Sequence, residues 1–257
     1  MSHLLCWPKT DRSLEQKNIN GYLALLGSGE YLPVMNETDR FLLAKSGANG
    51  RTPRVVCLPT AAGTEGDASV SHWMRMGEEH FKNLGANVVS LKLTNRNEAE
   101  QADFAEQIEQ ADLIYFSGGK PHYLYETLNG TTAWDAVLRA TARGAVFAGC
   151  SAGAMFIGEF LPDLRTFGLR QQHAFGILPG SHIFPHFDRI IAWRGLSIPL
   201  LQKLLPEGEY VLGLDEDTAL VGKLGQEWTV MGRQQVYIIT RHETLSFSSG
   251  STINLPV

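Results

Sequence analysis

Short apolar runs that alternate with amphipathic segments are the feature that most limits the fold of this chain. Apolar residues recur at helical spacing over 70–84, 104–111 and 134–141. Five apolar runs lie around these segments and are bounded by turn residues: YLALLG (22–27), RVVCLP (54–59), NVVSLKL (87–93), DLIYFSGG (112–119) and GAVFAGC (144–150). Their brevity and their β-branched and aromatic content predict buried strands. Alternating strands and helices predict an α/β fold, a mainly parallel sheet with helices on both faces.

The rest of the chain is expected to extend this one unit. Residues 1–20 show no sustained period and are interpreted as an irregular N-terminal extension, whereas 21–257 are interpreted as a single α/β domain. Four β-rich runs between residues 210 and 240 are joined by short turns, which predicts C-terminal β-hairpins that flank the main sheet. A chain of 257 residues can bury a large core without disulfides.

Composition restricts the setting and the partners. Cys6, Cys57 and Cys150 are an odd number at wide spacings without a CxxC pair, which indicates a reducing, cytoplasmic setting and no metal site. A net charge of −5 without a long basic run argues against nucleic acid. No signal-peptide core and no run of roughly 18 apolar residues is present, so neither export nor a membrane is expected. No cofactor is predicted, and a homodimer is left open.

The stretch FAGCSAGAM places two candidate nucleophiles, Cys150 and Ser151, side by side between glycines. It follows a predicted strand and begins like a helix, which is the setting of a GxSxG nucleophile elbow. The residues two before and two after the nucleophile must be small, because strand and helix pass closely there. Ser151 has Gly149 and Gly153 at these positions, which favours Ser151. The alternative is a helix N-terminus made of small residues, with Cys150 as a buried hydrophobe.

A serine nucleophile needs a base, and the nearest downstream candidates are His173, His182 and His186. His186, in SHIFPHFDR, follows an apolar run and is the expected base, although a half-buried histidine packed between phenylalanines is an equal alternative. His173 lies in a polar segment, RQQHAFG, and is expected to be exposed.

The acid of the triad is expected between the serine and the histidine, where the chain offers Glu159 and Asp163. Glu159 is expected on the helix that leaves the elbow, facing away from the nucleophile, so Asp163 is the predicted acid. The three carboxylates of GLDEDTAL (213–220) are interpreted as solvated residues of a turn at a strand end.

The oxyanion of an acyl-transfer reaction needs two N–H donors. Ala152, directly after the nucleophile, is predicted to supply one. Gly118 and Gly119, which end a predicted strand, are predicted to bring the second. An ordinary glycine turn before the helix that starts near Pro121 is the alternative.

Four motifs in order, FSGGKPHYLYETL, AGCSAGAM, PHF and GLDEDTALV, resemble the serine-dependent branch of the class I glutamine amidotransferase-like fold. This is the peptidase family of aspartyl dipeptidase (dipeptidase E) and cyanophycinase, and the likeness runs over about 22–221. The resemblance implies nucleophilic Ser151, base His186, and an oxyanion hole from Gly119 and Ala152. It also implies hydrolysis of peptides.

Within that family, PHF is closer to the dipeptidase E pattern, whose members cleave after an N-terminal aspartate. Where cyanophycinases carry Asp-Gln before the histidine, this chain has Phe184 and Pro185. An acidic substrate needs a cation, and the candidate substrate-binding residues are Lys120, Arg189 and Arg194. We therefore expect a serine-dependent hydrolase of short peptides or isopeptides of the Asp-X type, acting through an acyl-enzyme. The alternatives are a cyanophycinase-like exopeptidase, a thiol enzyme using Cys150, and a catalytically silent binding protein for small molecules.

Overall fold

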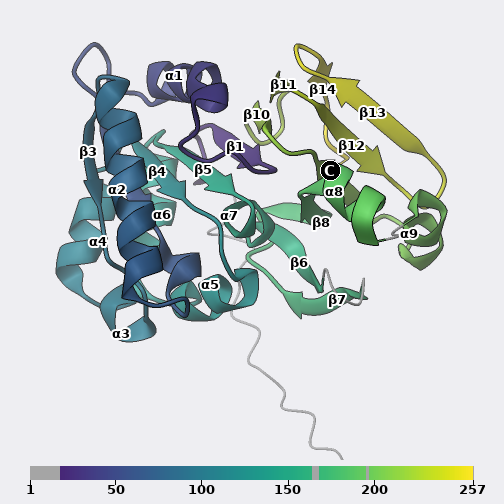
Figure 1. Ribbon diagram of the computed structural model, residues 1–257, viewed down its shortest axis with the longest axis horizontal. Helices are drawn as coiled ribbons and strands as arrows, with labels where there is room; N and C mark the ends of the chain where they lie inside the picture. Colours follow the sequence, from purple (N-terminus) through teal and green to yellow (C-terminus); the bar gives the residue numbers. More distant parts are fainter. Residues whose placement is uncertain (1–17, 164–167, 195–196, 257) are drawn as a thin grey trace, which may run out of the picture.

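The computed structural model describes residues 18–163, 168–194 and 197–256 and shows two β-sheets with helices around them (Figure 1). Residues 1–17 of the expected N-terminal extension lie outside this part. The strands are β1 (Leu23–Leu26), β2 (Arg54–Leu58), β3 (Asn87–Ser90), β4 (Leu113–Phe116), β5 (Val146–Cys150), β6 (Gly158–Asp163), β7 (Gly168–His173), β8 (Leu178–Pro185), β9 (Tyr210–Leu214), β10 (Thr218–Gly222), β11 (Trp228–Gly232), β12 (Gln235–Ile239), β13 (Thr244–Ser248) and β14 (Thr252–Ile253). The α-helices are α1 (Asn36–Lys45), α2 (Asp67–Asn83), α3 (Arg96–Ala99), α4 (Ala102–Glu109), α5 (Pro121–Leu128), α6 (Thr132–Ala142), α7 (Ala152–Met155), α8 (Phe187–Arg194) and α9 (Ile198–Leu204).

The first sheet contains the five strands that the apolar runs predict. Its order is β14-β11-β10-β1-β5-β4-β2-β3, and the strands from β1 to β3 in this order are parallel. Parallel neighbours place their carboxyl ends at one edge of the sheet, which is where open α/β sheets bind ligands. The ends of β1, β4 and β5 are therefore adjacent.

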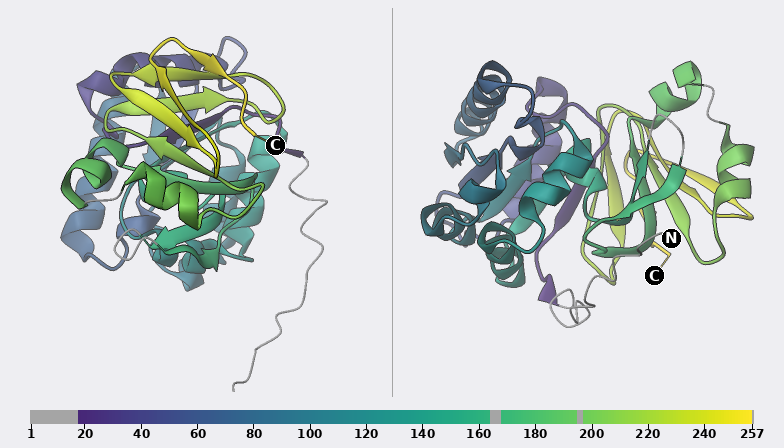
Figure 2. Two further views of the ribbon diagram at one scale, coloured as in Figure 1. Left: turned by 90° about the vertical axis from the view of Figure 1, so that its right-hand side faces the viewer. Right: turned by 90° about the horizontal axis from the view of Figure 1, so that it is seen from below.

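Helices cover both faces of this sheet, so the predicted α/β class is confirmed (Figures 1 and 2). Residues on β1, β2, β4 and β5 alternate between two core clusters because successive strand side chains point to opposite faces. One cluster packs Leu42 of α1 and Phe81 of α2 against the sheet. The other packs Ile108 of α4 and Val137 of α6 on the opposite face. None of the helices in the described ranges is long and apolar enough to cross a membrane.

A second sheet was not predicted. Its order is β13-β12-β9-β8-β6-β7, and α8 and α9 pack on its outer side through Phe187, Ile190 and Leu201 (Figure 2, right). The four strands expected between residues 210 and 240 all form, but they divide between the sheets. β10 and β11 extend the first sheet, whereas β9 and β12 belong to the second. The chain between β9 and β10 therefore crosses from one sheet to the other.

The helix after the elbow is shorter than expected. α7 ends at Met155, and β6 begins at Gly158, so Glu159 lies on a strand and not on a helix. Its carboxylate accepts a hydrogen bond from the N–H of Gly180 at 2.5 Å, which connects β6 with β8 within the second sheet.

The elbow itself is as tight as the glycine spacing predicts. A Cβ on Gly149 would lie 1.8 Å from the carbonyl oxygen of Gly153, and a Cβ on Gly153 would lie 2.4 Å from that of Phe116. Both neighbours are backbone atoms, one in the turn itself and one at the end of β4, and they cannot rotate away as a side chain would. Only glycine fits at these two positions.

Gly149→Ala is expected to destabilise the protein by about 3 kcal/mol or more, because overpacking against backbone costs at least as much as overpacking a core. Equilibrium unfolding in urea measures this difference. Gly130→Asn is the control, since Gly130 has φ +71°, a Cβ there would have no atom within 4 Å, and asparagine tolerates this backbone conformation. Equal stability of the two variants would contradict the steric account of the elbow.

Candidate active site

Ser151 stands at the carboxyl end of β5 in a strained backbone conformation. Its φ and ψ are 52° and −112°, a region that non-glycine residues rarely occupy. The N–H of Ser151 donates to the carbonyl of Leu26 at 2.9 Å, which continues the pairing of β5 with β1 and holds the turn in place. Strain of this kind is characteristic of functional sites, where the surrounding structure fixes it.

His186 is brought to this serine from the second sheet. It follows β8 directly, and its Nε2 lies 2.7 Å from Ser151 Oγ. The other two histidines lie elsewhere: His173 is an exposed residue of β7, and His182 is buried beside Glu209 and the carbonyl of Leu169. The structure therefore joins the two residues that the sequence singles out as nucleophile and base.

The carboxylate beside His186 belongs to Glu216. Its Oε1 lies 3.4 Å from His186 Nδ1. Both side chains are partly buried, with 29% of Glu216 and 37% of His186 exposed. Because a carboxylate only accepts, this contact places the imidazole proton on Nδ1 and leaves Nε2 free to accept the proton of Ser151. The separation exceeds the usual range of about 2.7–3.2 Å, as is common for catalytic contacts without substrate.

Two expectations are corrected by this geometry. The carboxylate at Nδ1 is that of Glu216 and not that of the predicted acid, Asp163, which ends β6. The acids after β9 are also not simply a solvated turn, since Asp215 is buried and burial raises its pKa to about 6. The sequence signal available for Glu216 was the position of GLDEDTAL directly after a predicted strand. An expectation based on the chain order serine, acid, histidine does not reach Glu216, because Glu216 follows the histidine.

Two N–H groups are placed to serve as an oxyanion hole. Ala152 begins α7, and the initial N–H groups of a helix have no partner within it. Among the described residues no hydrogen bond is donated by the N–H of Gly119, whose Cβ would collide with the backbone of Ala61 at 2.4 Å. The third predicted donor is engaged: the N–H of Gly118 donates to Glu30 Oε1 at 3.0 Å.

Glu30 was not anticipated. Its second oxygen, Oε2, accepts a hydrogen bond from the thiol of Cys150 at 2.9 Å. Burial raises the pKa of this thiol well above its ordinary value, and the neighbouring carboxylate raises it further. Cys150 is thus fully buried, protonated and hydrogen-bonded away from Ser151 Oγ, and it lacks the thiolate that a cysteine nucleophile needs.

The three predicted substrate-binding cations differ in their surroundings. Lys120 is exposed beside Gly119, where it precedes α5. Arg189 donates from Nε to Glu216 Oε2 at 3.0 Å, so it contacts the carboxylate that lies beside His186. The side chain of Arg194 lies outside the part of the chain that the structure describes.

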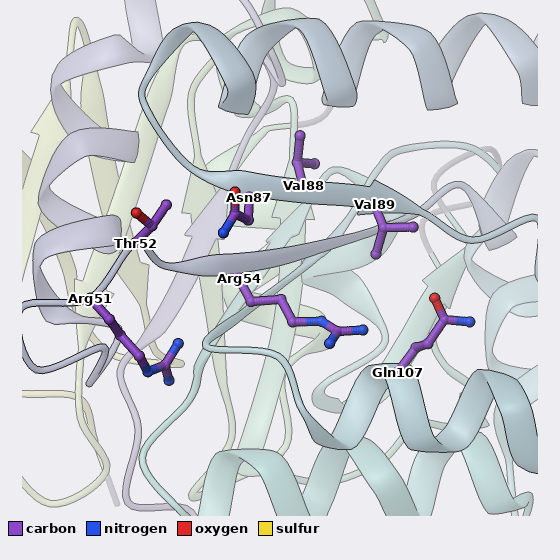
Figure 3. A pocket seen from close by; sticks show the side chains of 7 residues that line it. All are labelled: Arg51, Thr52, Arg54, Asn87, Val88, Val89 and Gln107. Atoms are coloured by element: carbon purple, nitrogen blue, oxygen red, sulfur yellow. The ribbon is translucent and has the colours of Figure 1, made fainter.

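A cavity of about 770 Å³ lies far from this site, at the amino ends of β2 and β3 (Figure 3). Figure 3 shows Arg54 and Gln107 pointing into the same space. Arg51 pairs with Asp112 and Arg54 donates to Gln110, and the described residues that line the cavity include no histidine, cysteine or carboxylate. It therefore lacks a group that could activate a nucleophile. No group of three or more potential ligand side chains within the described ranges could hold a metal ion.

Glu216→Gln is expected to slow the acylation of Ser151 by a fluorophosphonate about 10²- to 10⁴-fold, because an amide at this position no longer stabilises the imidazolium or fixes its tautomer. Asp163→Asn, the matched change at the acid expected from the sequence, should react at close to the wild-type rate. Time courses of covalent labelling measure both rates. A larger loss in Asp163→Asn than in Glu216→Gln would overturn the assignment.

Comparison with known proteins identifies the family of the chain. The model of peptidase family S51 matches residues 23–226. A cyanophycinase from Geminocystis herdmanii is 26% identical over 203 residues, which are 74% of this chain and 71% of that protein.

A crystal structure of a peptidase from an acI-B1 actinobacterium is 34% identical with a TM-score of 0.81, and the match covers 93% of this chain and 98% of that chain. A Listeria monocytogenes structure described as a putative peptidase E, 18% identical over 82% of this chain and 98% of its own, has a TM-score of 0.57 and shares the fold. The chain belongs to peptidase family S51, and the resemblance seen in its motifs is confirmed.

Proposed function

We propose that this protein is a serine peptidase that cleaves short peptides through an acyl-enzyme. The observation that carries the proposal is the 2.7 Å contact of His186 Nε2 with Ser151 Oγ at a strained elbow. Glu216 on the other side of the same imidazole supports it, since nucleophile, base and acid then form one chain of hydrogen-bonding groups.

In the acylation step, His186 Nε2 takes the proton of Ser151 Oγ as the oxygen attacks the peptide carbonyl carbon. The carbonyl oxygen becomes an oxyanion, which the N–H groups of Gly119 and Ala152 would bind. The imidazolium then gives its proton to the leaving amine, the C–N bond breaks, and the acyl group stays on Oγ. Glu216 stabilises the transient positive charge on the imidazolium.

In the deacylation step, His186 acts as base towards water. The water oxygen attacks the ester carbon, a second oxyanion forms in the same place, and the proton held by the imidazolium returns to Ser151 Oγ as the acid product leaves. Acylation and deacylation use the same side chains and N–H groups, so one arrangement of these groups serves both steps.

The finer part of the proposal concerns the substrate, which we take to be a peptide or isopeptide that carries a carboxylate, of the Asp-X type. Lys120 supports this, because it is exposed next to Gly119, at the edge where the scissile carbonyl would lie. A lysine there attracts a carboxylate as a flexible point charge. Arg189, which already contacts Glu216, is a weaker candidate for the same task.

The nucleophile is tested by labelling with a fluorophosphonate and mapping the adduct by mass spectrometry. Wild type and Cys150→Ser are expected to be labelled on Ser151, whereas Ser151→Ala is expected to show no adduct. Cys150→Ser keeps a hydroxyl donor for Glu30, so the buried hydrogen bond survives.

Iodoacetamide provides the complementary control. It should leave the hydrolytic activity of the wild type unchanged, because the buried thiol of Cys150 does not ionise at neutral pH. Activity that persists in Ser151→Ala and is lost on alkylation would instead show a thiol enzyme. Absence of labelling in a folded wild type would show a catalytically silent protein.

The substrate class is tested by comparing Asp-X and β-Asp-X dipeptides with the matched Asn-X dipeptides. Lys120→Gln is expected to raise KM for the acidic peptides about three- to fivefold and to leave the neutral ones unchanged, which is the size of an exposed ion pair. Lys92→Gln is the control, since Lys92 pairs with Asp67 away from the site. An equal effect on acidic and neutral peptides would contradict the role of Lys120.

A further inference from the structure

The carboxylate of Glu216 has two oxygens with different partners. Oε1 faces His186 Nδ1 at 3.4 Å, and Oε2 accepts a hydrogen bond from Arg189 Nε at 3.0 Å. Because each carboxylate oxygen has its own partner, rotation of the Glu216 carboxylate about its Cγ–Cδ bond is restricted. A glutamate that is held on one side only could turn its second oxygen to solvent and leave the imidazole.

The main chain of Glu216 is fixed separately. Its N–H donates to Asp188 Oδ1 at 3.1 Å, and its carbonyl accepts from Gln234 Nε2 at 2.9 Å. The backbone position of this residue therefore does not depend on Arg189. What Arg189 adds is the orientation of the side chain.

Arg189 and the base belong to one rigid element. α8 begins at Phe187, directly after His186, and the N–H of Arg189 donates to the carbonyl of His186 at 3.1 Å. The first turn of this helix thus links the imidazole to the guanidinium that holds its acid. Any movement of α8 would move both together.

The charges around the imidazole are mainly negative. Besides Glu216, the carboxylates in this turn and in the first turn of α8 are those of Asp188, Asp215 and Asp217, and burial raises the pKa of Asp215 to about 6. Two arginines offset them: Arg233, which pairs with Asp217 at 3.4 Å, and Arg189, which pairs with Glu216 and lies 3.6 Å from Asp188. Of the two, Arg189 is the cation that contacts the acid of the site.

We propose that Arg189 is a positioning residue, which orients Glu216 towards His186 and limits the negative charge that favours the imidazolium. This inference rests on the proposed serine peptidase function. Removing the guanidinium leaves Glu216 and Asp188 without this cation, and their negative charge then favours the imidazolium, which cannot take the proton of Ser151. The loss should be greatest on the acidic side of the pH profile.

The test uses an uncharged alkyl fluorophosphonate, which has no carboxylate for Arg189 to bind. The rate of Ser151 acylation is measured against pH in wild type, Arg189→Gln, Arg189→Lys and Arg233→Gln. In Arg189→Gln we expect the midpoint of the acidic limb to move up by about half a pH unit, and the rate at the plateau to fall several-fold. Arg189→Lys should keep the midpoint close to wild type, because it keeps the charge, with a plateau between those of wild type and Arg189→Gln.

Arg233→Gln is the matched control, because Arg233 is an exposed arginine paired with the neighbouring Asp217 and does not contact Glu216. It should leave midpoint and plateau unchanged. An Arg189→Gln profile identical to wild type, or a shift of equal size in Arg233→Gln, would overturn the positioning role. An effect seen only with acidic peptides would show substrate binding instead. If the wild type is not acylated at all, the proposed function fails and not this inference alone.

Discussion

The buried carboxylate of Glu30 joins the ends of the three strands on which the site is built. Glu30 belongs to the loop after β1, and its two oxygens accept from Gly118 after β4 and from Cys150 at the end of β5. Ser151 follows Cys150 and Gly119 follows Gly118, so the proposed nucleophile and one proposed oxyanion donor are each one residue from this cross-link. Loss of the carboxylate would leave two buried donors without their partner, which costs more than the hydrogen bonds themselves gain.

Backbone strain is concentrated around the same point. Five non-glycine residues in the described ranges have positive φ, and four of them, Tyr31, Ser151, His186 and Asp217, belong to the proposed triad or directly follow Glu30 or Glu216. Such conformations persist only where the surrounding structure determines them. Here that structure is the junction of two sheets: Ser151 follows a strand of the first, His186 follows a strand of the second, and Glu216 lies where the chain crosses between them. The site therefore depends on how the two sheets pack.

This dependence explains what could be predicted from the sequence. Ser151 has a local sequence signal, because the glycines needed for the tight turn are its near neighbours in the chain. The five parallel strands also have a local signal, which is their apolar runs. Glu216 has no such local signal, since its contact with His186 arises because β8 pairs with β9, and these strands lie far apart in the sequence. Chain order favours Asp163, but hydrogen-bonding geometry places no constraint on the order of triad residues. The second sheet has no comparable signal at its start, because α7 is only four residues long and β6 begins at Gly158.

The choice between the two adjacent nucleophile candidates is made by strand geometry. Side chains along β5 alternate between faces, and Cys150 points into the core cluster that also holds Leu26 and Ala148. At Ser151 the backbone leaves the strand with φ +52°, which ends the alternation and turns the hydroxyl to His186. Moving the nucleophile back by one residue would place it in the core beside Glu30, where burial and a neighbouring carboxylate both suppress ionisation of a thiol. Serine is therefore the residue that this elbow exposes, and the cysteine before it serves to anchor the turn.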